Sequence, residues 1–149
     1  MRIHDLMKRD VVRCSPQTHL DEAVGLMWRK GCGFLPVVDG DVVVGILTDG
    51  DVAVCAWRRG VPLGQLRAMD AMTTKPVVVS DDERLERAEE LMCQGQVHRL
   101  PVVDGSGCLI GVISLGDMAR APRRGPGGSH RDDIVSTLAA LNRRRPPSC

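Results

Sequence analysis

The stretch GILTDGD at residues 45–51 returns in nearly the same form as GVISLGD at residues 111–117. Each copy opens with a glycine, continues with a short apolar run, and then places a hydroxyl residue three positions before an aspartate. These hydroxyl–aspartate pairs are Thr48 with Asp51, and Ser114 with Asp117. A motif of this length that occurs twice in one short chain indicates an internal repeat.

The segments that precede the two copies also match. Residues 7–40 align with residues 72–105 without a gap, and both segments end in the letters LPVVDG. One additional residue in the turn after Asp104 shifts the alignment before the second motif. Matched pairs include Met7 with Met72, Leu20 with Leu85, and Pro36 with Pro101. The chain is therefore a tandem duplication.

Both repeats predict the same order of elements. Short β-branched runs at residues 11–12 and 77–79 predict a first strand, and apolar residues at helical spacing follow each run. Two apolar runs separated by turn residues then predict a hairpin, and a second helix follows. The expected fold class is α/β (α+β), with two β-α-β-β-α repeats packed with pseudo-twofold symmetry.

The repeats also set the expected domain boundaries. Residues 1–62 form the first repeat and residues 63–121 the second. Residues 122–130 are rich in Gly, Pro and Arg, which predicts a flexible linker. Residues 131–149 are expected to form an amphipathic helix and a basic end. We expect this helix to dock on its own domain or on a second subunit, and the basic end to be solvated.

Size and composition exclude several classes of protein. The chain has 149 residues, which is enough for one domain or for two small halves that share a core. No apolar run approaches the roughly 18 residues that cross a bilayer, so we expect a cytoplasmic protein without a membrane partner. The net charge of +1 gives no global electrostatic argument for nucleic acid. Six scattered cysteines without a C-x-x-C pair predict buried free thiols rather than disulfides or a metal site.

The hydroxyl–aspartate motif has two interpretations. It fits a capping box, in which the hydroxyl accepts a hydrogen bond from the first helical turn and the acid accepts one from the N-cap N–H. A helix start is also an anion site, where a phosphate can bind beside the hydroxyl while the acid accepts the hydroxyls of a ribose. The residues alone leave both roles open.

We find no nucleophile–base pair, metal cluster or Walker-type loop, so we do not expect an enzyme.

The duplicated pattern of strand, helix, LPVVD, hairpin and hydroxyl–aspartate motif resembles the cystathionine-beta-synthase (CBS) domain. Such domains occur as a tandem pair, the Bateman module, and the resemblance covers about residues 5–121. It implies a standalone regulatory module that forms disc-like homodimers through helices and relays ligand occupancy to a protein partner. It also implies regulatory adenosyl ligands, namely AMP, ADP, ATP or S-adenosylmethionine, and no required cofactor. The alternative is a structural dimerisation or interaction module whose clefts stay empty.

The resemblance further implies two clefts, each combining the motif of one repeat with residues of the other. The stronger site joins Thr48 and Asp51 with Pro76, Val77, His98 and Arg99. Its counterpart joins Ser114 and Asp117 with Val11, Val12 and Phe34. A basic residue such as Arg99 is expected to meet a phosphate, although a solvated or interface arginine and a surface His98 are the simpler alternatives. The counterpart lacks a cation at the matching position and suits a ligand of little charge.

Two tryptophans lie on predicted helices. Trp28 and Trp57 are expected either to face a partner subunit together with Met27 or to pack in the core. The sequence does not choose between these two environments.

Overall fold

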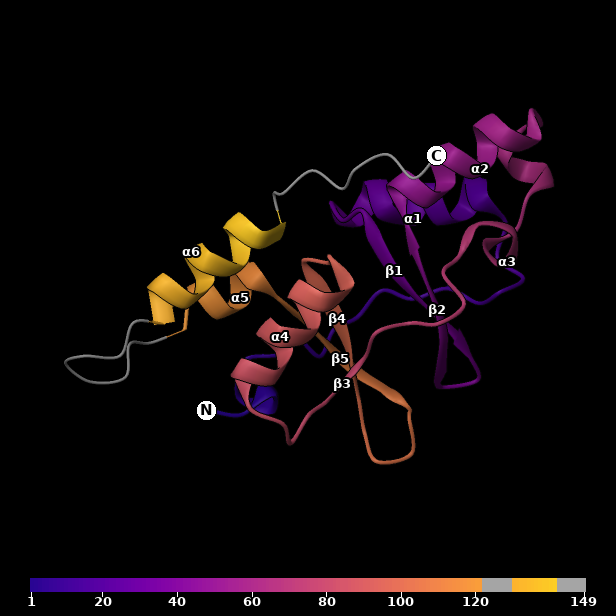
Figure 1. Ribbon diagram of the computed structural model, residues 1–149. Coiled ribbons are helices and arrows are strands. Elements are labelled where there is room, and N and C mark those ends of the chain that lie inside the picture. Colours follow the sequence, from indigo (N-terminus) through magenta and orange to yellow (C-terminus); the bar gives the residue numbers. More distant parts are fainter. Residues whose placement is uncertain (122–129, 142–149) are drawn as a thin grey trace. The chain divides into compact units, whose positions relative to one another are not determined.

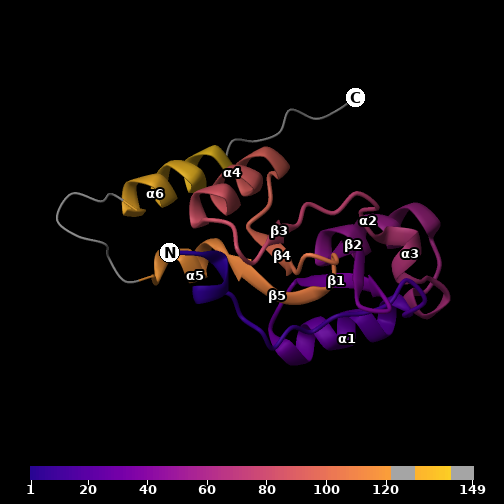
Figure 2. The ribbon, with the colours of Figure 1, turned by 90° about the horizontal axis from the view of Figure 1, so that it is seen from below.

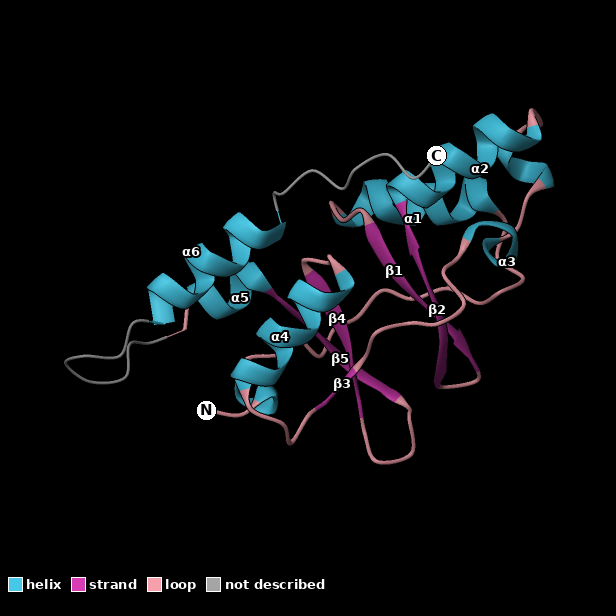
Figure 3. Cartoon of the chain, viewed as in Figure 1, coloured by secondary structure: helices cyan, strands magenta, loops and turns pink. Residues whose placement is uncertain are grey.

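The computed structural model describes residues 1–121 and 130–141, which form two compact units. Unit 1 contains residues 1–9, 77–104 and the described residues from Ile110 onward. Unit 2 contains residues 10–76 and 105–109. Each unit has a hydrophobic core of its own. Figure 3 shows that both units mix helices and strands, as the repeat pattern predicts.

Unit 2 is built on an antiparallel hairpin next to two helices. Its elements are α1 (Leu20–Lys30), β1 (Phe34–Asp39), β2 (Val42–Thr48), α2 (Asp49–Arg59), the short 3-10 helix η2 (Leu63–Gln65) and α3 (Ala68–Ala71) (Figure 1). Apolar residues at helical spacing on α1 face the hairpin, and α2 begins directly after β2. The core includes Leu20, Leu35, Val37 and Leu47, which are fully buried.

Unit 1 repeats this plan around a three-stranded sheet of order β3-β4-β5. Its elements are the 3-10 helix η1 (Ile3–Asp5), β3 (Val79–Ser80), α4 (Leu85–Gly95), β4 (Arg99–Val103), β5 (Leu109–Ser114), α5 (Leu115–Ala119) and α6 (His130–Leu141). Strand β3 pairs in parallel with β4, as expected for strands joined through a helix. The core includes Ile3, Met92, Leu100, Ile113 and Met118, which are fully buried.

The first strand of each repeat is shorter than the sequence predicts. Residues 11–12 form no strand, and the first repeat keeps only an isolated parallel bridge between Cys14 and Val37. The bridge ends there because Pro16 has no N–H and because the N–H of Ser15 donates to Thr18 Oγ1 at 3.0 Å. In the second repeat the strand is reduced to β3, so residues 77–78 lie outside it.

The N-terminal nine residues belong to unit 1 by their packing. The N–H of Ile3 donates to the carbonyl of Glu83 at 3.0 Å, and Lys8 exchanges two backbone hydrogen bonds of 2.9 Å with Val112. In unit 2, Thr73 makes the corresponding bridge to Ile46. The packing therefore divides the chain after residues 9, 76, 104 and 109, whereas the repeats are contiguous in sequence.

The glycine that opens each motif is explained by these bridges. A Cβ atom on Gly111 would lie 2.7 Å from Met7 Sδ and 3.0 Å from the carbonyl oxygen of Lys8. A Cβ atom on Gly45 would lie 2.8 Å from Met72 Sδ and 2.9 Å from a backbone oxygen. Only a residue without a side chain lets the bridging segment approach the strand so closely.

Helix α6 packs on its own unit. It contacts α4 and α5, and it lies beside them in both views of the ribbon (Figure 2). Ile134 is 5% exposed and joins the unit 1 core. Of the two expected docking places, the chain's own domain is confirmed. The predicted linker and basic end fall mainly on residues 122–129 and 142–149, which lie outside the described residues.

Both tryptophans are exposed, so the core alternative is wrong. Trp28 is 86% and Trp57 80% exposed, whereas Met27 is buried.

The five described cysteines are free thiols, and Cys14 and Cys55 are buried. Burial, assisted by the charge of Glu22, raises the pKa of the Cys14 thiol to about 11.

Among the described helices, none has the length and apolar character needed to span a membrane.

Candidate functional site

The motif in unit 2 forms a complete capping box at the start of α2. Thr48 is the N-cap, and its Oγ1 accepts a hydrogen bond from the N–H of Asp51 at 3.1 Å. In return, Asp51 Oδ2 accepts from the N–H of Thr48 at 2.9 Å. The capping interpretation of the motif is confirmed here, and the pair holds the first turn of α2 in a fixed geometry.

The motif in unit 1 forms the same box at the start of α5. The N–H of Asp117 donates to Ser114 Oγ, and the N–H of Ser114 donates to Asp117 Oδ2, both at 3.1 Å. The Ser114 hydroxyl also donates to Asp117 Oδ2 at 2.6 Å. This additional bond leaves less of the carboxylate available to another molecule.

The two motif aspartates differ in their charge environment. Asp117 is 8% exposed, and its Oδ1 lies 3.3 Å from Lys8 Nζ and 2.7 Å from Arg120 Nη2. Burial opposes its ionisation, but the hydrogen bonds from Ser114 and Lys8 and the charge of Lys8 together lower its pKa. Within the described part of the chain, no ion pair engages Asp51. Asp51 is therefore the carboxylate with acceptor capacity left for a ligand.

A groove of about 430 Å³ in unit 2 contains Asp51. Its lining comes from α2 and α3 and consists of Asp51, Val54, Cys55, Arg58, Arg59, Asp70 and Ala71. Asp51 and Arg58 are two helical turns apart and share a face of α2. Arg59 Nη2 lies 3.6 Å from Asp70 Oδ1, and both Arg58 and Arg59 are exposed. The groove thus combines two carboxylates, of Asp51 and Asp70, with two guanidinium groups, one of which is paired with Asp70.

These cations were not among the predicted site residues. Arg58 follows Asp51 by seven positions, a spacing that places two side chains on one helix face and was available as a signal in the sequence. The Lys8 contact to Asp117 has no comparable signal, because the two residues are far apart in sequence and meet only through the bridge to β5.

The other predicted site residues of unit 1 lie near its strand β4. Val77 packs against the unit 1 core. His98 has an exposed side chain, and its carbonyl accepts from the N–H of Leu115 at 3.1 Å. Arg99 is the first residue of β4 and is half-buried. These positions place the segment before LPVVD directly against the start of α5.

The remaining predicted residues belong to unit 2. Phe34 faces Thr48 in the β1–β2 register, so it is a neighbour of the motif in its own repeat. Val11 and Val12 are half-buried, and Val12 packs against the unit 2 core. Pro76 is the last residue before the chain passes to unit 1. Both predicted clefts combine residues of the two units, and those groupings stay predictions.

Comparisons with known proteins agree on one type of domain. The sequence profile described as CBS domain matches residues 3–56 and 68–124. The CBS domain-containing protein YhcV of Bacillus subtilis is 38% identical over 117 residues, which cover 78% of this chain and 82% of YhcV. The crystal structure of CBSX2 in complex with AMP has a TM-score of 0.70 at 31% identity, covering 80% of this chain and 93% of that one.

A second structure supports the fold alone. The CBS domain pair of protein MJ0100, solved with 5'-methylthioadenosine and S-adenosyl-L-methionine, has a TM-score of 0.71. It shares 21% identity with this chain, covering 80% of this chain and 98% of that one.

Proposed function

The chain belongs to the CBS domain family and carries two copies of the domain, and from this membership we propose that it is a regulatory module for an adenosyl ligand. AMP is the first candidate, because CBSX2, which is 31% identical to this chain, was solved in complex with AMP. ADP, ATP and S-adenosylmethionine share the adenosyl group and are the next candidates. Ligand occupancy would be relayed to a protein partner or to the oligomeric state of the chain.

The environment of Asp51 carries this proposal. Its carboxylate is held by the cap at the start of α2 and keeps acceptor capacity that suits the two hydroxyls of a ribose. Arg58 in the same groove has no ion pair within the described part of the chain and attracts a phosphorylated ligand, whereas Arg59 is already paired with Asp70. We further propose that Pro76, Val77, His98 and Arg99 complete this site, with Arg99 toward the phosphate.

The counterpart site around Ser114 and Asp117 is proposed to be the weaker of the two. Lys8 and Arg120 already neutralise Asp117, so a ribose would have to compete with two cations for the same carboxylate. Val11, Val12 and Phe34 would offer it only apolar contacts. We therefore expect this site to stay empty at AMP concentrations that fill the Asp51 site.

Thermal unfolding with and without ligand tests the proposal. A ligand that prefers the native state raises the melting temperature, so AMP at saturating concentration should raise that of the wild-type chain. Asp51→Asn should lose most of this rise, because an amide keeps a capping acceptor but removes the charge and one ribose acceptor. Asp49→Asn removes a charge from the same helical turn and should keep the rise.

Two outcomes would overturn different parts of the proposal. If none of AMP, ATP and S-adenosylmethionine raises the melting temperature, the chain is the alternative, a structural interaction module with empty clefts. If AMP stabilises Asp51→Asn as much as it stabilises the wild type, a ligand binds but the assigned site is wrong.

A further inference from the structure

The carboxylate of Asp117 has its acceptor positions filled by its own unit. A carboxylate has about four such positions, two on each oxygen. Oδ2 accepts from the N–H and from the hydroxyl of Ser114. Oδ1 lies 2.7 Å from Arg120 Nη2 and 3.3 Å from Lys8 Nζ. These contacts together use the acceptor capacity of the carboxylate.

Asp51 keeps most of this capacity. Its Oδ2 accepts from the N–H of Thr48, and the described residues place no cation within ion-pair distance of it. Asp51 is also half-buried, whereas Asp117 is 8% exposed. A ribose presents two hydroxyl donors, so it needs open acceptor positions on one carboxylate. Asp51 offers them and Asp117 does not.

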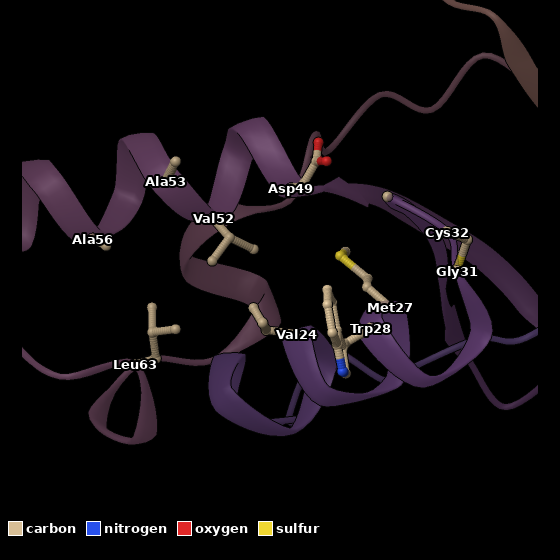
Figure 4. Close-up of a pocket in the computed structure, with 11 residues that line it drawn as sticks. Val24, Met27, Trp28, Gly31, Cys32, Asp49, Val52, Ala53, Ala56 and Leu63 are labelled. Atoms are coloured by element: carbon tan, nitrogen blue, oxygen red, sulfur yellow. The ribbon is translucent and has the colours of Figure 1, made fainter.

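The other acid in the first turn of α2 does not replace Asp51. Asp49 lines a separate groove of about 640 Å³ between α1 and α2, whose walls are mostly apolar side chains, as Figure 4 shows. Its Oδ1 accepts from the N–H of Gly50 at 2.8 Å. Asp51 instead lines the groove between α2 and α3. The comparison between the units therefore concerns Asp51 and Asp117.

The first cation on Asp117 comes from a position that both repeats share. Lys8 aligns with Thr73 in the duplicated sequence. Lys8 exchanges two backbone hydrogen bonds with Val112, and Thr73 exchanges two with Ile46. Each bridged residue lies five residues before the motif aspartate of its unit. The two bridges are thus equivalent, and they carry an ammonium group in unit 1 and a neutral hydroxyl in unit 2.

The second cation comes from the helical segment that the motif starts. Arg120 follows Asp117 by three residues, and Val54 follows Asp51 by three at the aligned position. Residues three apart are neighbours on a helix surface, which lets Arg120 reach Asp117. Val54 lines the groove of Asp51 and is 49% exposed. Being neutral, it leaves the carboxylate of Asp51 open.

We propose that these two positions decide which repeat binds the ligand. Lys8 and Arg120 take the place of a ribose on the acid of unit 1, and Thr73 and Val54 leave the acid of unit 2 free. The inference rests on the proposed function and adds the residues that limit the chain to one ligand. The side chains of Lys8 and Arg120 are 67% and 68% exposed, so they close the acid by charge and not by packing in the core.

Isothermal titration calorimetry with AMP tests whether unit 1 can be opened. The wild-type chain should bind one AMP. Lys8→Thr combined with Arg120→Val should bind two, because the exchange frees acceptor positions on Asp117. Adding Asp117→Asn to this variant should return the number to one. Arg9→Thr combined with Arg87→Val removes the same charge from exposed positions of unit 1 and should still bind one AMP.

The reverse exchange tests whether unit 2 can be closed. Thr73→Lys combined with Val54→Arg should lower the affinity for AMP at least about tenfold, because each cation would compete with the ribose for Asp51. Both positions are exposed, so circular dichroism should show an unchanged fold. Thr73→Ser combined with Val54→Ala changes the same positions without a charge and should keep the wild-type affinity.

Different results would overturn the inference and the proposed function. A wild type that binds no AMP would overturn both. Two AMP bound by the wild type, or a single AMP bound by Lys8→Thr with Arg120→Val, would overturn the assignment of these positions and leave the proposed function standing. Wild-type affinity in Thr73→Lys with Val54→Arg would do the same.

Discussion

The two motif aspartates share one local structure but differ in the charges around them. Both accept the N-cap N–H of a helix, and both are held by a hydroxyl three residues earlier. Lys8 and Arg120 then neutralise Asp117, whereas Asp51 shares a groove with Arg58. The cap is common to the repeats, and the neighbouring charges decide which carboxylate is available to a ligand.

The lowered pKa of Asp117 predicts a pH dependence of stability. Since its folded pKa lies below the usual 3.8, the stabilisation is fully present above about pH 3.8 and is lost as the pH falls through the folded value. The difference in free energy of unfolding between the wild type and Asp117→Asn should therefore shrink below about pH 3.8. Urea unfolding of both proteins at several pH values measures this difference.

Lys8→Met provides the control for this pH dependence. It removes one cation from Asp117 without touching the cap, so the folded pKa of Asp117 should rise toward its usual value and the part of the stability that is lost at low pH should be smaller than in the wild type. A difference between the wild type and Asp117→Asn that stays constant down to pH 2.5 would contradict the assignment.

At the scale of elements, the sequence predicted what is set locally. Helices α1 and α4, both hairpins and the helix starts at the motifs follow from apolar spacing, turn residues and caps, and the structure confirms them. The prediction of a strand at residues 11–12 was wrong. A strand forms only where a partner strand lies beside it, and a β-branched run carries no information about whether such a partner is in reach. For the same reason the bridge between Lys8 and β5 could not be predicted from the sequence.

In the candidate site, too, the features set by neighbouring residues were predictable and the long-range contacts were not. The capping roles of Thr48 and Ser114 were predictable, because a capping box is contained in four consecutive residues. The cations beside Asp117 were not, because Lys8 reaches it from the other end of the chain.

Because of the bridge between Lys8 and β5, we expect Gly111→Ala to lower the stability of the fold. The added methyl group would meet Met7 Sδ, which can move, and the carbonyl oxygen of Lys8, a residue that two backbone hydrogen bonds to Val112 hold in place. We expect a loss of about 1–3 kcal/mol in free energy of unfolding, measured by urea denaturation. Gly105→Ala is the matched control, because its Cβ meets nothing within 4 Å. Equal stability of the two variants would show that the bridge is not tightly packed.

At the scale of the whole molecule, the two separate cores predict that each unit can open by itself. Ile3 is fully buried in unit 1, and its truncation to Ala should cost about 2–5 kcal/mol. In native-state hydrogen exchange, Ile3→Ala should lower protection in α4 and β4 and spare α1 and β1. Leu35→Ala, fully buried in unit 2, should give the reverse pattern. Equal loss of protection throughout both variants would mean a single cooperative unit.

The placement of the first nine residues bears on the order of events during synthesis. Residues 10–76, which make up most of unit 2, emerge from the ribosome as one continuous piece and can collapse around their own core at once. Ile3 and Met7 leave the tunnel before them, yet their core neighbours between Val79 and Met118 are translated only after residue 76. Residues 1–9 are thus made before unit 2, but they can be buried only after most of unit 2 has been made.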